Sequence, residues 1–288
     1  MTNNVEEALP QVKRPARSII GWLTLDQALS IQSGFMKTDT PNPEHEVIYR
    51  RLRESVERRG PEINQTDLIL ELPEELNDHV ERLRATQEAK IFFDQGWQVK
   101  IADLSRIIGI QAHVFIDHTK ERTANLNQEN FQSLIETTLP IPSKTILPIQ
   151  FDPIKNAWII GSQNPNLRII GNFKGEVNGF PGFGFVIQIA PSFMQVVKIN
   201  NKYILRDGYH RSFGLLQKGI SKVPVLYKEF SPMEDLGLPA GMLSPGIYFG
   251  DRPPILTDYL NDQVSIEVGF PATQKMIVIQ GLELNHLG

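Results

Sequence analysis

The sequence contains no cysteine among its 288 residues. Disulfide bonds, thiolate nucleophiles and cysteine-bound zinc or iron–sulfur centres are therefore excluded, because each of them needs a thiol. Any chemistry has to rely on oxygen and nitrogen groups or on a bound cofactor.

Long apolar segments are absent as well. No run approaches the roughly 18 consecutive apolar residues of a membrane helix. The polar segment from Met1 to Gln11 lacks the apolar stretch of a signal peptide. We therefore expect a cytoplasmic protein without a membrane partner, and a hydrophobic content of 41% is sufficient for a packed core.

An excess of basic charge is also missing, since the net charge is −4. Proteins that coat nucleic acid need clustered lysine and arginine to neutralise phosphates, so we do not expect DNA as a partner. The charge is unevenly distributed: residues 1–140 contain 16 basic and 22 acidic side chains, and residues 141–288 contain 13 and 11. The second half therefore suits an anionic ligand better.

The first 140 residues have the apolar periodicity of helices. Apolar residues at four-residue spacing predict a helix over residues 44–59. A second helix is predicted from Pro73 to Gly96, and a third from Gln128 to Leu139. We expect a helical N-terminal region over this half.

Residues 101–118 resemble a helix-turn-helix pattern with a turn at Gly109. The corresponding recognition helix has no lysine or arginine and includes Asp117, so we do not expect it to bind DNA. His113 and His118 lack the spacing of a zinc-binding helix and have no evident third ligand. We interpret both histidines as structural.

After about residue 145 the pattern changes to short β-rich runs separated by turn residues. The predicted strands are 146–151, 158–160, 167–170, 185–189, 195–199 and 203–205. Residues 264–268 and 276–279 predict a closing β-hairpin. The predicted fold class is α+β: a helical region over residues 1–140, then a mostly β domain over residues 141–288 that ends in this hairpin.

Residues 175–185 are the most glycine-rich part of the chain. We predict a mobile connection between strands. The alternative is a loop that closes over a nucleotide, with Phe180 or Phe183 stacking on the base.

The clearest signal lies between residues 193 and 230. Two β-prone runs flank Asn200-Asn201, a pair that tolerates positive φ angles, and this predicts a hairpin. The second run leads into Asp207-Gly208. A helical spacing follows until Gly219, after which residues 223–225 resume a strand.

A strand-to-helix turn of this kind can hold phosphate, because the first amides of a helix lack intrahelical acceptors. Gly208 would let the backbone approach the phosphate, and His210 and Arg211 would add charge-assisted hydrogen bonds. Asp207 would cap the helix or hold a hydrated Mg²⁺. The same residues also fit an ordinary capped amphipathic helix that carries a surface arginine.

The stretch from Tyr203 to Val225, YILRDGYHRSFGLLQKGISKVPV, resembles the phosphate-binding segment of the ParB/sulfiredoxin superfamily. In ParB N-terminal domains, sulfiredoxins and free-serine kinases, a G-x-x-R turn between a strand and a helix holds nucleotide phosphates. The resemblance implies a mixed α/β domain that binds ATP or another nucleoside triphosphate with Mg²⁺. The implied cofactor-binding residues are Asp207, Gly208, Tyr209, His210 and Arg211, with Asp207 also contacting the metal.

The resemblance has limits. Sulfiredoxin carries its catalytic cysteine immediately before the histidine, where this chain has Tyr209, so sulfiredoxin chemistry is excluded. ParB proteins continue into a helical DNA-binding region, whereas the downstream sequence here is rich in proline and β-like. The specific match covers about 30 residues, from 193 to 230 at most.

The resulting hypothesis is a nucleotide-binding protein that hydrolyses nucleotide or transfers phosphoryl to an unidentified small-molecule or protein acceptor. The predicted catalytic residues are His210, Arg211 and Asp251. Asp251 lies in a proline-bounded loop, where it would act as a base or metal ligand or would simply pair with Arg252. The alternative function is a non-catalytic, nucleotide-switched regulator or a DNA-associated adaptor. Because Arg211 is expected in the first turn of an exposed helix, we also expect Arg211→Ala to leave the fold intact.

Overall fold

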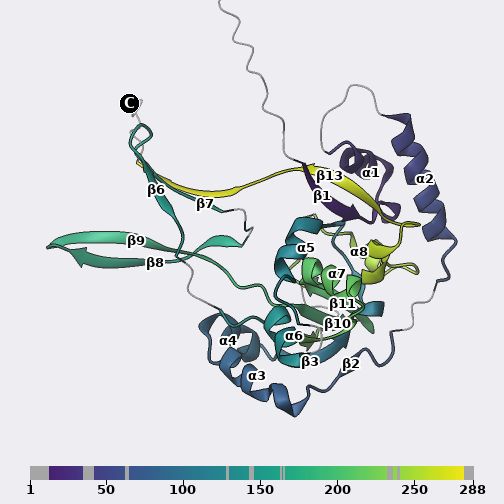
Figure 1. Ribbon diagram of the computed structural model, residues 1–288, viewed down its shortest axis with the longest axis horizontal. Helices are drawn as coiled ribbons and strands as arrows, with labels where there is room; N and C mark the ends of the chain where they lie inside the picture. Colours follow the sequence, from purple (N-terminus) through teal and green to yellow (C-terminus); the bar gives the residue numbers. More distant parts are fainter. Residues whose placement is uncertain are drawn as a thin grey trace, which may run out of the picture. The chain divides into compact units, whose positions relative to one another are not determined.

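A computed structural model describes residues 13–34, 42–61, 65–127, 130–142, 146–162, 164, 166–231, 236–238 and 241–281. The described residues form both helices and strands, and most strand pairs are antiparallel, in agreement with the α+β class (Figure 1). The segment from Met1 to Gln11 and the predicted helix start at Gln128 lie outside the described residues.

The chain forms two compact units. Unit 1 consists of residues 1–141 and 192–272, and unit 2 consists of residues 142–191 and 273–288. The predicted division into 1–140 and 141–288 is therefore wrong, although the change of periodicity near residue 140 does mark one border of unit 2. The prediction failed because local periodicity does not report which distant segments pair with each other.

Unit 1 is organised around a six-stranded mixed sheet with the order β2-β3-β12-β10-β11-β4. Its strands are β2 (Ile69–Leu70), β3 (Gln98–Asp103), β4 (Ile108–Gly109), β10 (Gln195–Ile199), β11 (Lys202–Asp207) and β12 (Lys222–Glu229). β3 pairs with β12 and β10 pairs with β11 in antiparallel fashion, whereas β10 and β12 run parallel. Strands from both predicted domains therefore share one sheet.

The helices of unit 1 follow the predicted positions in part. The described helices of four or more α-helical residues are α1 (Leu25–Gln32), α2 (Pro43–Glu57), α3 (Asn77–Arg84), α4 (Gln87–Asp94), α5 (Ile116–Arg122), α6 (Phe131–Thr138), α7 (Tyr209–Gln217) and α8 (Pro245–Tyr248). α2 and α6 confirm two predicted helices. The helix predicted from Pro73 to Gly96 is divided, because Thr86 caps a new helix by accepting a hydrogen bond from the Ala89 amide.

The helix-turn-helix pattern at residues 101–118 is wrong. This segment forms the end of β3, a 3₁₀ turn η3 (Leu104–Arg106), β4, and β5 (His113–Phe115), and only α5 follows as a helix. The branched side chains of isoleucine and valine are restricted at χ1 and favour strands, so apolar spacing alone gave a misleading helical pattern.

A second, three-stranded sheet of unit 1 has the order β13-β1-β5. Its central strand is β1 (Lys13–Ser18), which pairs antiparallel with β5 and with β13 (Ile266–Pro271). The predicted closing hairpin is therefore wrong, because β13 pairs with β1 whereas β14 (Lys275–Gln280) pairs with β7 in unit 2.

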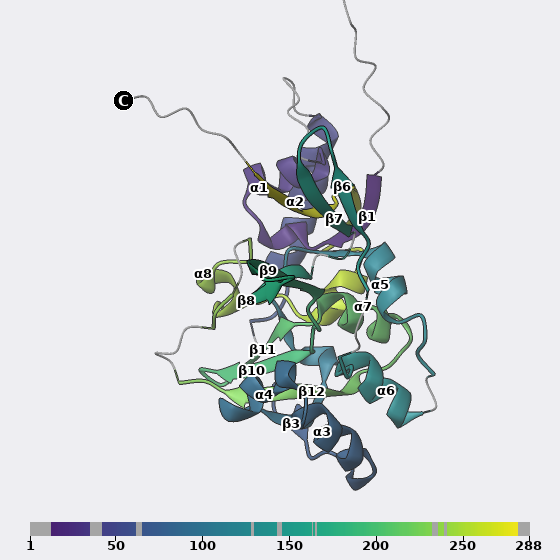
Figure 2. The same ribbon diagram turned by 90° about the vertical axis from the view of Figure 1, so that its left-hand side faces the viewer.

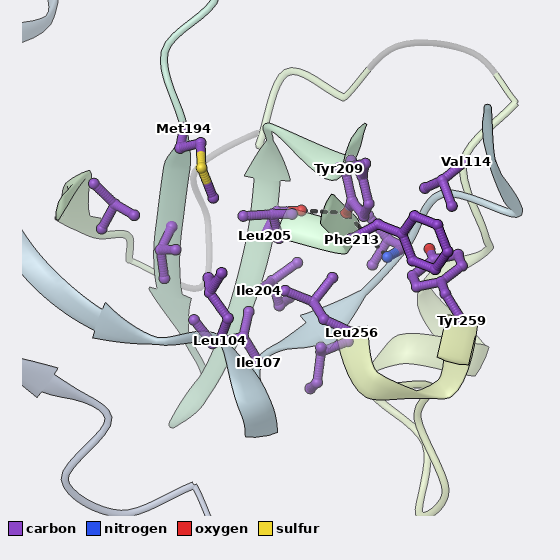
Figure 3. Packing of buried hydrophobic residues seen from close by; sticks show 14 of the residues in the cluster. Leu104, Ile107, Val114, Met194, Ile204, Leu205, Tyr209, Phe213, Leu256 and Tyr259 are labelled. Carbon is purple, nitrogen blue, oxygen red and sulfur yellow. Dashed lines mark hydrogen bonds between the residues drawn. The ribbon is translucent and has the colours of Figure 1, made fainter. Parts of the chain in front are cut away.

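The core of unit 1 lies around β11 and α7 (Figure 3). Leu205, Phe213 and Tyr259 are almost fully buried there, and Tyr209 lies beside them. Tyr209 donates its hydroxyl hydrogen to the Leu205 carbonyl and accepts a hydrogen bond of 3.0 Å from the Ile110 amide. α7 is thereby fixed against the sheet at its first residue.

Unit 2 consists of strands in two small sheets. β14, β7 (Ala157–Ser162) and β6 (Ile149–Asp152) form one, and β8 (Leu167–Val177) and β9 (Phe180–Ile189) form the other as a two-stranded hairpin. The glycine-rich segment 175–185 was predicted to be a mobile connection, which is wrong. It forms the turn and the flanking strands of the β8–β9 hairpin.

Candidate functional site

The predicted hairpin, helix and strand between residues 193 and 230 are confirmed as β10, β11, α7 and β12. Asn200 and Asn201 turn the hairpin with φ angles of 50° and 59°. Gly208, with φ of 106°, joins β11 to α7, and a Cβ there would lie 2.5 Å from Cγ of Met194. Only glycine fits this turn, because it combines a left-handed conformation with a close neighbour.

Asp207 precedes this glycine and is already hydrogen-bonded within the protein. Its Oδ1 accepts a 2.6 Å hydrogen bond from the Gly208 amide, and its Oδ2 accepts one of 3.1 Å from the Ser192 hydroxyl. The N-cap of α7 is Gly208 and has no side-chain cap, so the predicted capping by Asp207 is wrong. The first-turn amides of α7 consequently have no capping side chain.

Arg211 is only 3% exposed, which contradicts the expected surface arginine. Its Nη1 donates to the carbonyls of Thr137 and Thr138 at 3.3 and 3.0 Å, and its Nη2 donates to the Ser192 hydroxyl at 2.8 Å. Burial lowers the pKa of Arg211 to about 10, and the charge of Asp207 opposes this shift. The expectation that Arg211→Ala leaves the fold intact therefore has no structural basis, because this guanidinium joins α6, α7 and the segment before β10.

A cavity of about 340 Å³ opens beside this guanidinium. Its lining comes from α5, α6, α7 and the segments that follow them: Glu121, Arg122, Asn125, Ser133, Glu136, Thr137, Pro140 and Arg211. α5 and α7 pack side by side, as Figures 1 and 2 both show. This pocket places two arginines, two carboxylates and two hydroxyl side chains around one space.

Except for Arg211, none of the lining residues was predicted from the sequence. Arg122 and Ser133 precede Arg211 by more than 70 residues, and they reach it only because α5 and α6 pack near α7 and β12. A single sequence has no local signal for such a contact. The sequence shows only that Glu121, Arg122 and Asn125 are close together at and just after the end of α5.

His210 points elsewhere. Its ring stacks on Phe115 with a centroid distance of 6.0 Å and an interplanar angle of 6°, and its centroid lies 5.3 Å from that of His118. Its Nε2 is buried and has no hydrogen-bond partner among the described residues. Burial, together with the neighbouring His118 and Arg122, lowers the pKa of His210 to about 3. His210 is therefore a neutral member of an aromatic cluster.

Asp251 lies at the opposite end of β11. It lines a separate pocket of about 520 Å³ together with Asn200, Asn201 and Lys202 at the hairpin turn. Lys202 Nζ donates to the carbonyls of Phe249 and Gly250 at 2.9 and 2.7 Å, and burial lowers the pKa of this lysine.

The three predicted catalytic residues consequently do not lie together in the fold. β11 separates Lys202 from Asp207 by five residue steps, or roughly 17 Å at about 3.3 Å per residue. Arg211 borders one pocket, Asp251 borders another, and the ring of His210 packs in the aromatic cluster. Over the described part of the chain, no three histidine, aspartate or glutamate side chains are grouped so that they could hold a metal ion.

Comparisons with protein-family models, curated proteins and solved structures found no significant match for this chain. No helix within the described ranges is both long and apolar enough to cross a membrane.

Proposed function

We propose that unit 1 binds the phosphates of a nucleoside triphosphate with Mg²⁺ in the pocket beside Arg211. The observation that carries the proposal is a buried guanidinium that borders a cavity and makes no ion pair with any described carboxylate. A buried cation without an anion in direct contact is costly, and a bound phosphate would compensate its charge.

The donors of Arg211 leave room for such a ligand. An arginine side chain has five N–H groups. Three of them are accounted for by Thr137, Thr138 and Ser192, and the remaining two have no acceptor within the described ranges. The three protein acceptors would hold the guanidinium in a fixed position, while the free pair of donors would bind phosphate oxygens in a forked geometry.

The other pocket residues fit a nucleotide that carries a metal ion. Arg122 adds positive charge, and Ser133 adds a hydroxyl donor. Glu121 and Glu136 are exposed carboxylates that would repel a free phosphate, but they suit Mg²⁺, which prefers oxygen ligands and usually bridges them to phosphates. We accordingly move the proposed metal contact from Asp207, whose oxygens are both hydrogen-bonded, to these glutamates.

The resemblance of residues 203–225 to the ParB/sulfiredoxin segment also supports phosphate binding. It places Gly208 and Arg211 at the phosphate-binding positions, and the confirmed strand, glycine turn and helix agree with that arrangement. Catalysis is less well supported, because Asp251 and the ring of His210 lie away from Arg211. This separation favours the second candidate function, a nucleotide-switched regulator without turnover.

The test is calorimetric titration of the full chain with ATP, GTP and CTP in the presence of Mg²⁺. Arg211→Lys keeps the charge and loses the fork, and it should weaken binding by roughly ten- to a hundredfold. Arg50→Gln is the matched control, since Arg50 is exposed on α2, and it should bind as wild type does. The proposal is wrong if no nucleotide binds to the folded wild-type protein.

A second variant separates the ligand site from the structural role of Arg211. Glu136→Gln removes an exposed carboxylate from the pocket and should not affect folding. It should reduce the gain in affinity that Mg²⁺ provides by a few fold. Phosphate release, measured on the same samples, distinguishes hydrolysis from a binding switch.

A further inference from the structure

The β8–β9 hairpin of unit 2 carries large apolar side chains in solvent. Phe180 is 74% exposed, Phe183 59% and Phe173 56%, and Ile169 and Ile170 are each about half exposed. Among the described strands, β8 and β9 pair only with each other, as Figure 1 shows. A two-stranded ribbon of this kind is marginally stable in water unless something packs against it.

Both faces of the ribbon carry aromatic rings. Residues paired across antiparallel strands share a face, so Phe173 lies with Gly184 on one face and Phe183 lies with Lys174 on the other. Phe173 covers Gly184, where an added Cβ would lie 2.4 Å from the ring, and Phe183 packs edge to face on Phe185 at 5.0 Å. Exposed aromatic rings therefore lie on both faces, which marks the ribbon as a surface for association.

The turn determines which backbone groups point away from the ribbon. Asn178 and Gly179 have φ angles of 54° and 82° and form a two-residue turn. The two residues that flank such a turn exchange backbone hydrogen bonds with each other, and every second cross-strand pair further along the hairpin does the same. The amides and carbonyls of Lys174 and Glu176 consequently point to the outer edge of β8.

The outer edge of β9 is different. Pro181 pairs with Glu176, so its nitrogen lies on the outer edge and has no hydrogen to donate. The outer edge of β8 from Asn172 to Glu176 contains no proline and retains its donors. β8 is therefore the edge that can accept another strand.

We propose that the outer edge of β8 pairs antiparallel with β8 of a second copy of the chain, with Gly175 on the two-fold axis. In this register Lys174 lies opposite Glu176 of the second copy, and Glu176 lies opposite Lys174 of that copy. A register centred on Lys174 would instead place two lysines opposite each other, which is unfavourable. The charges therefore favour this register. In the resulting four-stranded sheet the face with Phe173 and Gly175 is apolar, whereas on the other face the Lys174–Glu176 pairs lie between the Phe183 rings of the two copies.

A membrane surface is the other occupant that exposed aromatic rings suggest, and the charge pattern disfavours it. Glu176 and Lys174 lie within five residues of the turn, so insertion of the hairpin tip would carry charged groups into the apolar layer. Pairing with a second copy places each of these two charges opposite a charge of the other sign.

Sedimentation velocity of the full chain over a dilution series tests the proposal. Wild type should dimerise reversibly, and Glu176→Lys should weaken the dimer by roughly tenfold, since it opposes like charges at both symmetry-related pairs. Lys174→Glu should do the same. The double variant K174E/E176K exchanges the charges and should restore the wild-type dissociation constant.

Three outcomes would overturn the proposal. One is a wild-type chain that remains monomeric at every concentration. Another is a dimer that the single charge reversals leave unchanged or that the double variant does not restore. The third is a monomer that floats with vesicles of phosphatidylcholine and phosphatidylserine, which would assign the hairpin to a membrane. Circular dichroism should confirm that each variant folds, because both altered side chains are exposed.

Discussion

Phe213 in unit 1 and Phe180 in unit 2 are the same residue type in opposite environments, 2% and 74% exposed. In unit 1 the helices cover the strands of a six-stranded sheet, so aromatic rings on α7 are buried. In unit 2 the strands that contain most of the exposed aromatics form a ribbon of only two strands. Burial here follows from the number of layers around a strand rather than from the hydrophobicity of its sequence.

The two units also differ in the environment of their polar side chains. In unit 1 the buried Arg211 and the partly buried Ser192 form a hydrogen-bonded network with Asp207, which holds the candidate pocket in shape. In unit 2 Lys174 and Glu176 are exposed at a strand edge. We infer that unit 1 has a preformed ligand site and that unit 2 has a surface for association.

The largest expected difference between the units is the loss in free energy of unfolding when each phenylalanine is replaced by alanine. Phe213→Ala should lower the free energy of unfolding by about 3–5 kcal/mol, because it leaves a cavity in a packed core. Phe180→Ala should change it by less than about 0.5 kcal/mol at dilutions where the chain is monomeric. Urea unfolding followed by circular dichroism provides the measurement. Equal losses for the two variants would show that the ribbon is packed within the monomer.

The sequence predicted the parts of this fold that depend on neighbouring residues. Asn200-Asn201, Gly208 and Gly219 were correctly placed as turn residues, because a positive φ angle restricts the residue type locally. The pairing of β3 with β12 and of β1 with β13 was missed, since these partners lie more than 100 residues apart.

The candidate site was predicted only in part for the same reason. Arg211 was identified from its spacing to Gly208, but its burial depends on Thr137, Thr138 and Ser192, which come from other elements. Asp251 was selected as a loop carboxylate, yet no local pattern could show that its loop packs at the far end of β11. Whether the pocket binds a nucleotide stays a prediction.

The aromatic cluster around His210 predicts a pH dependence of unit 1. The pKa of His210 falls from 6.5 to about 3, so the folded state binds fewer protons than the unfolded state between these values. Stability is fully present above pH 6.5 and decreases as the pH falls toward 3, by up to about 1.4 kcal/mol per pH unit from this residue. His113 and His118, whose pKa values burial also lowers, act in the same direction.

This dependence is measured as the urea midpoint for the unfolding of unit 1 at a series of pH values between 7 and 4. His210→Phe keeps a ring beside Phe115 and removes the titrating group, so the slope should flatten. Arg14, Arg122 and Asp117 also face the cluster, and they remain in the variant. An unchanged slope would mean that the ring of His210 reaches water in the folded state.

Excision of unit 2 has the smallest expected effect on the stability of unit 1, and it tests most directly which unit carries which function. Residues 142–191 would be replaced by a short glycine-serine linker, and the chain would end at residue 272. The Met194 amide donates a 3.0 Å hydrogen bond to the Thr138 carbonyl, so the two cut ends already lie near each other. A small change in loop length costs well under about 1 kcal/mol, so the melting temperature should shift by no more than about 4 °C.

Nucleotide affinity should persist and self-association should disappear, because the pocket belongs to unit 1 and the β8 edge to unit 2. A shortened chain that folds but no longer binds nucleotide would place part of the ligand site in unit 2, and one that still dimerises would remove the β8 edge as the contact.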